Sequence, residues 1–541
     1  PAQTTRLPDD TRYVALHESL AAKLSALSAV TDADAHEPSL RLSAVAAGLV
    51  SSWAPDLKQL KLDKESRGRL KRAKEAATLQ PELPCTLQAV LRSYQREGFE
   101  WMTRLAHWGA GACLADDMGL GKTVQTLALL LKRAEDGPAL VVAPTSVCGG
   151  WLEQAQRFAP TLQTEILTAA PDTHAWGEYT VVVVSYTMMV NHIDTLAEIP
   201  FSTVVLDEAQ AIKNASTQRA KAARRLKGAF RIATTGTPIE NHLGEVWSLM
   251  TFLNPGLLGT AKAFDRRFAK SSADAPQLDA LRNLLKPFIL RRQKRNVLKE
   301  LPERTEIIIE IEPSEEEIAF SEALRRRAVD RFNKNGRSAK KSAVSLLAEL
   351  TRLRQAACHP ALVDENIGLS SSKLTHLTDL AKELVQGGHR MLVFSQFVSF
   401  LSHVRQAFEQ NDISYQYLDG STPRRERERS VREFQAGRGD AFIISLKAGG
   451  TGLNLTGADY VIHLDPWWNP AIDDQASSRA HRIGQKRPVT VYKLITKGSV
   501  EERVYALHGE KRNLAEKLLS GTSSAQIPDA ETLLALLQET R

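Results

Sequence analysis

The sequence predicts an α/β fold with two lobes, each a parallel sheet flanked by helices, and helical insertions between them. Short apolar runs alternate with helical segments from about residue 91 to residue 236, and the alternation resumes after residue 372. Buried strands that alternate with helices are typical of parallel sheets covered by helices. The length of 541 residues also exceeds one domain, since a domain usually has about 100–200 residues.

The first lobe is expected over residues 81–240. Pro81 and Pro84 interrupt any helix at these positions and therefore mark the start of the lobe. Residues 1–80 form a separate N-terminal segment, with helical periodicity at residues 13–27 and 57–77. The strands expected in the lobe are residues 112–115, 139–143, 181–185 and 204–206.

The remainder of the chain divides into three segments. Residues 241–372 are charged and mostly helical, contain a strand-like stretch at 307–311, and are interpreted as insertions and the connection between lobes. Residues 373–520 are expected to form the second lobe, and residues 521–541 a C-terminal tail. The strands expected in the second lobe are residues 391–394, 415–418, 441–445, 460–463 and 489–494.

Composition excludes several classes of protein. No apolar run approaches the roughly 18–20 residues that span a bilayer, so no membrane partner is expected. The four cysteines lie far apart, which excludes a disulfide scaffold and favours reduced, intracellular thiols. The net charge of +7 is compatible with nucleic-acid binding without deciding it. A chain that starts at Pro1 suggests a fragment or a processed product.

A phosphate-binding loop is predicted at residues 115–123, Ala-Asp-Asp-Met-Gly-Leu-Gly-Lys-Thr, between a strand and a helix. Gly119 and Gly121 allow backbone N–H groups to approach an anion. Lys122 is expected to reach the β- and γ-phosphates, and the Thr123 hydroxyl to ligate Mg²⁺. Asp116 stands where the strict pattern has Gly. The alternative is a polar turn that caps a helix.

Two adjacent carboxylates, Asp207 and Glu208, follow the strand expected at 204–206. Asp207 would hold Mg²⁺ and Glu208 would orient and deprotonate a water molecule. The alternative is an ordinary acidic start of a helix, favoured by the helix dipole.

Arg479 and Arg482, near the end of the second lobe, are three residues apart and are expected on one face of a helix. Paired guanidiniums suit a developing phosphoryl charge. In isolation, a solvated basic face is the alternative.

Weaker candidates lie on a helix start and at strand ends. Gln95 could bind the edge of adenine or could be an ordinary surface residue. Small polar and basic side chains after strands suit contacts to phosphate and sugar, or else cap strand ends and turns. These candidates for nucleic-acid binding are Thr145, Ser146, Ser395, Gln396, Lys447, Thr451 and Asn454.

Ten motifs, in their order along the chain, resemble the motif series of the SWI/SNF-like ATPases, which belong to helicase superfamily two. They lie between residues 91 and 504, at 91–95, 116–123, 207–210, 235–241, 288–292, 393–397, 418–422, 449–455, 465–470 and 479–485. The family ordinarily has an acidic residue at the position of Asp116. Gln210 stands where many relatives have His, which leaves both carboxylates in place.

The resemblance implies two RecA-like lobes with ATP in the cleft between them and double-stranded DNA bound across both. It places Gln95 near adenine and assigns Lys122, Asp207 and Glu208 to catalysis, with Arg479 and Arg482 completing the site and Arg482 as the arginine finger. The residues implied to bind ATP and Mg²⁺ are Gln95, Asp117, Gly119, Gly121, Lys122, Thr123 and Asp207.

These observations predict a DNA-stimulated ATPase that translocates on double-stranded DNA and remodels or displaces DNA-bound proteins without separating the strands. The alternatives are a strand-separating helicase, an ATP-gated DNA clamp with little hydrolysis, and an RNA-directed motor. Duplex DNA and an unidentified DNA-bound protein are the expected partners of a monomeric chain. The expected location is the cytoplasm or nucleoid of a bacterium or archaeon, or the nucleus of a eukaryote.

Overall fold

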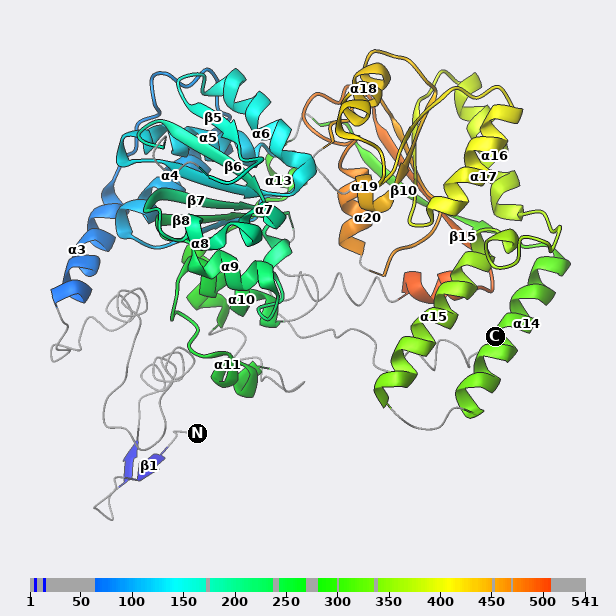
Figure 1. The fold of residues 1–541 in the computed structure, drawn as a ribbon, viewed down its shortest axis with the longest axis horizontal. Helices are drawn as coiled ribbons and strands as arrows, with labels where there is room; N and C mark the ends of the chain where they lie inside the picture. Colours follow the sequence, from blue (N-terminus) through cyan, green and yellow to red (C-terminus); the bar gives the residue numbers. More distant parts are fainter. Residues whose placement is uncertain are drawn as a thin grey trace. The chain divides into compact units, whose positions relative to one another are not determined.

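The computed structural model describes residues 4–6, 13–15, 64–171, 176–236, 243–268, 281–298, 301–334, 339–449, 453–468 and 470–506. The described residues up to Val297 form one compact unit, and those from Leu298 onward form a second (Figure 1). Each unit contains one parallel sheet flanked by helices, so the predicted α/β fold class is confirmed.

The described part of the first unit contains a seven-stranded sheet in the order β5-β6-β4-β7-β8-β3-β9, with parallel neighbours throughout. Every residue of β4 and β6 is buried, because these Val-rich strands lie inside the sheet with helices on both faces. The strands are β3 (Ala112–Leu114), β4 (Ala139–Ala143), β5 (Gln163–Ile166), β6 (Thr180–Ser185), β7 (Phe201–Asp207), β8 (Gly228–Thr234) and β9 (Ile289–Leu290).

Figure 1 shows α4, α5 and α6 on one side of this sheet and α7, α9 and α10 on the other. The helices in the described part of the first unit include α3 (Lys64–Thr78), α4 (Ser93–Trp108), α5 (Lys122–Lys132), α6 (Thr145–Phe158), α7 (Tyr186–Asn191), α8 (Ile193–Leu196), α9 (Gln218–Arg225), α10 (Leu243–Leu253), α11 (Ala261–Phe268) and α13 (Lys294–Val297). Short 3₁₀ turns follow at Ala134–Asp136, Ala209–Ile212 and Lys286–Phe288.

The described part of the second unit contains a six-stranded parallel sheet in the order β10-β15-β14-β11-β13-β12. Its strands are β10 (Arg304–Ile311), β11 (Met391–Ser395), β12 (Tyr415–Leu418), β13 (Ala441–Ser445), β14 (Tyr460–His463) and β15 (Val489–Thr496). The helices in the described part of this unit include α14 (Glu315–Lys334), α15 (Ala339–Cys358), α16 (Ser372–Gln386), α17 (Val398–Gln410), α18 (Arg424–Gln435), α19 (Leu446–Gly449) and α20 (Pro470–Ser477).

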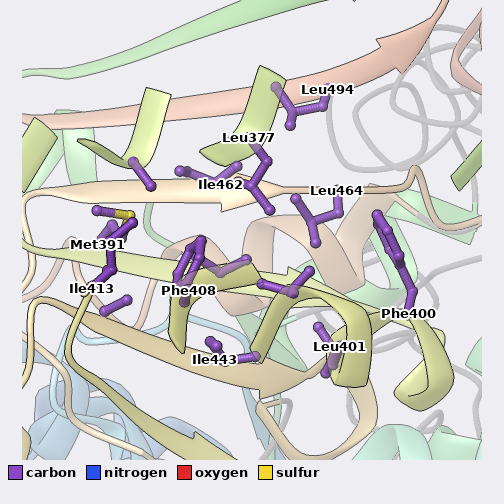
Figure 2. Packing of buried hydrophobic residues seen from close by; sticks show 14 of the residues in the cluster. Leu377, Met391, Phe400, Leu401, Phe408, Ile413, Ile443, Ile462, Leu464 and Leu494 are labelled. Atoms are coloured by element: carbon purple, nitrogen blue, oxygen red, sulfur yellow. The ribbon is translucent and has the colours of Figure 1, made fainter. Parts of the chain in front are cut away.

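Two apolar cores cover the two faces of this second sheet, and successive residues of β11 alternate between them. Met391 and Val393 belong to the core beneath α16 and α17, together with Phe408 (Figure 2). Leu392 and Phe394 belong to the opposite core. This alternation follows from the two-residue period of a strand and explains why its sequence is apolar without a break.

The sheets extend beyond the expected strands. The strand-like stretch at 307–311, expected among the helical insertions, is part of β10 and pairs with β15 in the second sheet. The sequence did not predict β5, β8 and β9: β5 is a half-exposed edge strand of polar residues, and β9 has two residues.

The expected helix at residues 13–27 is wrong where the structure describes it. β2 (Tyr13–Ala15) pairs antiparallel with β1 (Thr4–Arg6), because an aromatic and a β-branched residue favour an extended strand. The described part of the helix expected at 57–77 corresponds to α3. Residues 1–3, 7–12 and 16–63 and the 521–541 tail lie outside the described residues.

Candidate nucleotide-binding site

The predicted phosphate loop lies between β3 and α5, at the carboxyl edge of the first sheet. Gly119 and Gly121 have φ angles of 85° and 80°, in the left-handed region that favours glycine. A Cβ atom on Gly121 would also collide with Nε2 of Gln95. The loop conformation therefore requires glycine at position 121 both for backbone geometry and for space.

Lys122 lies at the start of α5, where its ammonium group donates to the backbone oxygens of Asp116, at 2.7 Å, and Asp117, at 3.4 Å. Burial lowers the pKa of Lys122, while the nearby carboxylates of Glu208, Asp116 and Asp207 oppose that shift. The structure therefore brings the predicted lysine close to both predicted carboxylates.

Asp207 ends β7 with its carboxylate fixed from two sides. Oδ1 accepts hydrogen bonds from Thr234 Oγ1 at 2.6 Å and from the Glu208 amide at 3.0 Å. Oδ2 accepts a hydrogen bond of 2.8 Å from Nε1 of Trp151 on α6. Sequence reasoning missed Trp151, because a Trp on an amphipathic helix has the pattern of an ordinary core residue.

The backbone around Asp207 and Glu208 is also constrained. The Tyr186 hydroxyl donates to the Asp207 carbonyl at 2.9 Å, and burial together with the two carboxylates holds the pKa of Tyr186 well above its usual value. Glu208 has a φ of 50°, which costs a non-glycine residue about 1–2 kcal/mol. Such strain occurs mainly at functional positions.

Gln210, the residue that replaces His in the tetrad, holds the Glu208 side chain. Its Nε2 donates to Glu208 Oε2 at 2.8 Å, and its Oε1 accepts from Thr235 Oγ1 at 3.0 Å. A hydrogen-bonded chain therefore links Glu208 to the end of β8. The rest of the motif that begins at Thr235, residues 237–241, lies outside the described residues.

Gln95 lies in the first turn of α4, directly against the phosphate loop. Its Oε1 accepts from the Arg92 amide at 3.0 Å, and its Nε2 donates to the Leu120 carbonyl at 3.0 Å. The Tyr94 hydroxyl donates to the same carbonyl at 3.1 Å. Gln95 is therefore buried beside the loop, and its contact with adenine stays a prediction.

The side chains near the loop fit a nucleotide-bound Mg²⁺ better than a protein-held metal. Within the described ranges, no group of three or more His, Cys, Asp or Glu side chains could hold a metal ion. Mg²⁺ in nucleotide sites needs only one or two protein oxygens, because phosphates and water supply the others. The Thr123 hydroxyl and the Asp207 carboxylate, whose Oδ2 accepts only the Trp151 hydrogen bond from the described residues and so keeps one lone pair, match that requirement.

The expected helical face with Arg479 and Arg482 is wrong. Helix α20 ends at Ser477, and hydrogen-bonded turns follow, in which the Arg479 N–H donates to the Ala476 carbonyl at 3.1 Å. The Gln485 side-chain amide donates hydrogen bonds to the Ala480 carbonyl at 3.1 Å and to the Ala458 carbonyl at 2.8 Å. These bonds connect the turns to the loop that precedes β14. Arg479 is buried, while the half-buried Arg482 donates to the Leu453 carbonyl at 3.3 Å.

Most candidates for nucleic-acid binding are accessible. Thr145, Ser146, Lys447 and Asn454 are exposed and Gln396 is half-buried, whereas Thr451 lies outside the described residues. Ser395 is a correction: it is 1% exposed, its hydroxyl donates to Asp465 and it accepts from the Phe397 amide at 3.0 Å. Ser395 therefore shapes the end of β11 and has no surface available for a contact.

The second unit also contains a buried charged cluster that the sequence did not predict. Lys373 on α16 donates to Glu501 at 2.6 Å and to the Leu464 carbonyl at 2.8 Å, with both side chains almost fully buried. Arg354 on α15 contacts the Pro466 carbonyl and lies over the rings of Phe397 and Trp468. These contacts join helices to the carboxyl edge of the second sheet.

A phosphate loop followed by an acidic strand end defines the class of P-loop nucleotide-binding proteins. The family model "SNF2-related domain" matches residues 94–362, and "Helicase conserved C-terminal domain" matches residues 372–484. In addition, no helix within the described ranges is both long and apolar enough to span a bilayer.

Relatives support the same assignment. "Putative ATP-dependent helicase/translocase YwqA" of Bacillus subtilis (strain 168) is 37% identical over 510 residues, which is 89% of this chain and 55% of that protein. "SWI/SNF-related matrix-associated actin-dependent regulator of chromatin subfamily A member 1" of Homo sapiens is 37% identical, covering 76% of this chain and 42% of that protein. The chain spans about half the length of the curated relatives it matches.

The solved structure "Sulfolobus solfataricus SWI2/SNF2 ATPase core in complex with dsDNA" is 35% identical, with 82% of this chain and 96% of that chain covered and a TM-score of 0.42. The two family models together match more than half of the chain. The chain therefore belongs to the SNF2-related family of helicase superfamily two.

Proposed function

We propose that this chain is the core of an ATP-driven, double-stranded DNA translocase that remodels or displaces DNA-bound proteins without separating the strands. The observation that carries the proposal is the convergence of Lys122, Asp207 and Glu208 at one sheet edge, next to a phosphate loop. A clamp that hydrolyses little could dispense with Glu208, whereas here its strained backbone and its bond to Gln210 hold it in place.

Each residue has a separate role in the proposed hydrolysis. Lys122 would exchange the Asp116 carbonyl for the β- and γ-phosphates. Thr123 and Asp207 would hold Mg²⁺, which would supply positive charge against the phosphates. Glu208 orients the attacking water and accepts its proton. Arg479 and Arg482 are proposed to complete the site from the second unit, with Arg482 stabilising the charge on the transferred phosphoryl group.

Duplex DNA is the proposed substrate because the motif series resembles that of the SWI/SNF-like ATPases, and because two relatives are named a helicase/translocase and a regulator of chromatin. Contacts through Thr145, Ser146, Gln396, Lys447, Thr451 and Asn454 would reach phosphate and sugar rather than bases. Such contacts give weak sequence preference and binding that weakens as salt rises.

The test is ATP hydrolysis measured with and without duplex DNA over a salt titration. We expect DNA to stimulate hydrolysis and Lys122→Ala or Glu208→Gln nearly to abolish it, while thermal unfolding stays cooperative. Hydrolysis that ignores DNA, or a wild-type rate in either variant, would refute the proposal. RNA in place of DNA tests for an RNA-directed motor.

Translocation is tested by displacement of a triplex-forming third strand, in parallel with displacement of one strand of a forked duplex. Triplex displacement without unwinding supports the proposed function. Unwinding of the fork would instead identify a strand-separating helicase, and neither activity together with tight ATP-dependent binding would identify a clamp.

A further inference from the structure

We propose that Arg292 is a positioning residue for the phosphate loop, acting through a buried ion pair with Asp116. This inference rests on the proposed nucleotide site. Arg292 Nε donates to Asp116 Oδ1 at 2.9 Å, and Nη2 donates to Oδ2 at 2.5 Å. The Asp116 side chain is fully buried and that of Arg292 is 11% exposed, so little water screens the pair.

The cluster around this pair is closely packed. Gln125 on α5 accepts from Arg292 Nη2 at 2.8 Å and donates to Asp116 Oδ2 at 3.3 Å. The guanidinium lies 5.2 Å from the centre of the Tyr94 ring and donates to the Tyr94 carbonyl. A Cβ on Gly98 would lie 2.8 Å from Arg292 Nη2 and collide with Gln125, so the cluster packs directly against the Gly98 backbone.

Hydrogen bonds from backbone groups also connect the segment around Arg292 to residues 115–117 of the phosphate loop. The Ala115 amide donates to the Leu290 carbonyl at 2.7 Å, and the Asp117 amide donates to the Arg292 carbonyl at 2.9 Å. The Lys294 amide donates to Asp117 Oδ2 at 2.9 Å. Residues 290–294, which we call the strap, therefore run beside residues 115–117.

The position of residues 116 and 117 matters because Lys122 is bonded to both of their carbonyl groups. A phosphate loop binds by presenting backbone N–H groups and a lysine in a preset arrangement. The Asp116 side chain points to Arg292 inside the protein, so the guanidinium pairs with the negative charge that an acidic residue adds at the position of the usual glycine. The ion pair thereby fixes the arrangement before the nucleotide arrives.

A purely structural ion pair would change stability without changing nucleotide affinity, and the test separates the two. Binding of methylanthraniloyl-ADP with Mg²⁺ is measured by fluorescence, and thermal unfolding is measured on the same samples. The first variant is Arg292→Lys, which keeps the charge but loses the paired geometry. Its matched control is Arg133→Lys, directly after the C-terminus of α5 and so at the end of that helix opposite to the phosphate loop. The Arg133 guanidinium is comparably buried and donates hydrogen bonds to the Thr203 hydroxyl at 3.0 Å and the Ser202 carbonyl at 3.1 Å.

We expect Arg292→Lys to raise the Kd for the nucleotide about tenfold, since charge-assisted bidentate contacts are among the strongest hydrogen bonds. Arg133→Lys should stay within twofold of the wild type even if both variants lower Tm equally. At saturating ATP, kcat of Arg292→Lys should be largely retained because Asp207 and Glu208 are untouched.

Asp116→Asn provides a second measurement that keeps the shape of the side chain. Combined with Arg292→Lys it should raise Kd no more than the worse single variant, because both disrupt one contact. Additive effects, or a Kd for Arg292→Lys and Asp116→Asn equal to that of Arg133→Lys, would overturn the inference. A wild-type chain that binds no nucleotide would instead refute the proposed function.

Discussion

Replacing Trp151 by Phe tests how far Asp207 depends on its surroundings. The substitution keeps an aromatic ring in the core and removes the indole N–H that donates to Asp207 Oδ2 over 2.8 Å. A hydrogen bond to a charged group contributes about 1.5–3 kcal/mol. Since about 1.4 kcal/mol corresponds to a factor of ten, that range corresponds to roughly 10- to 150-fold.

The lower end of this range is expected, because Oδ1 keeps its bonds from Thr234 and the Glu208 amide. We therefore expect kcat/KM for ATP to fall about tenfold and the Mg²⁺ concentration needed for half-maximal activity to rise. A carboxylate that lacks the Trp151 bond can rotate and binds the hydrated ion less well.

The assay is ATP hydrolysis at saturating duplex DNA over a Mg²⁺ titration. Trp247→Phe is the matched control. Trp247 lies on α10, away from Asp207 in the chain, and the substitution removes its indole hydrogen bond of 3.1 Å to the Gly259 carbonyl. Both variants are assayed well below their Tm. If the two variants show the same Mg²⁺ dependence and the same kcat/KM within twofold, the reasoning about Asp207 fails.

Three further predictions concern burial and backbone geometry. Burial raises the pKa of Asp473 to about 8. Between about pH 4 and pH 8 the folded state therefore keeps a proton that the unfolded state has lost, so the free energy of unfolding falls as pH rises, by up to about 1.4 kcal/mol per pH unit. Asp473→Asn should remove this decline when Tm is measured against pH, and a decline in the variant that runs parallel to that of the wild type would contradict the prediction. Lys373→Met leaves the Glu501 carboxylate buried without its cation, so we expect a loss of about 3–5 kcal/mol in chemical denaturation. The double variant Lys373→Met/Glu501→Leu should recover most of it, and no recovery would count against the pairing. Gly121→Ala should abolish binding of methylanthraniloyl-ADP, whereas Gly137→Ala, with a φ of 118° and nothing within 4 Å of the added Cβ, should bind normally; equal binding by both would refute the steric argument.

The central strands could be predicted from sequence because their environment is uniform. Residues of β4 and β6 are buried on both faces, so composition alone marks them. The edge strand β5 is polar and half-exposed, and nothing in its four residues distinguishes it from a loop. The turns around Arg479 depend on Gln485, whose side chain binds carbonyls up to 29 residues away in the chain.

The chemistry of the site was predictable where it follows local spacing, as for Lys122 in the loop and Asp207 at a strand end. The contacts that hold these side chains in place were not predictable, because they join residues that are far apart in the chain. Trp151 and Asp207 are 56 residues apart, and Arg292 and Asp116 are 176 apart. Asp116 itself was recognised as a departure from the strict pattern, but only the structure shows where its side chain points.

The strap has a mechanical consequence, since it is continuous with the chain that leaves the first unit at Val297. Tension on that stretch of polypeptide would reach residues 115–117 through these hydrogen bonds. For the proposed translocase, we therefore expect an opposing force to weaken nucleotide binding, so that half-maximal velocity needs a higher ATP concentration. Optical-trap records of velocity under load at several ATP concentrations measure this dependence directly.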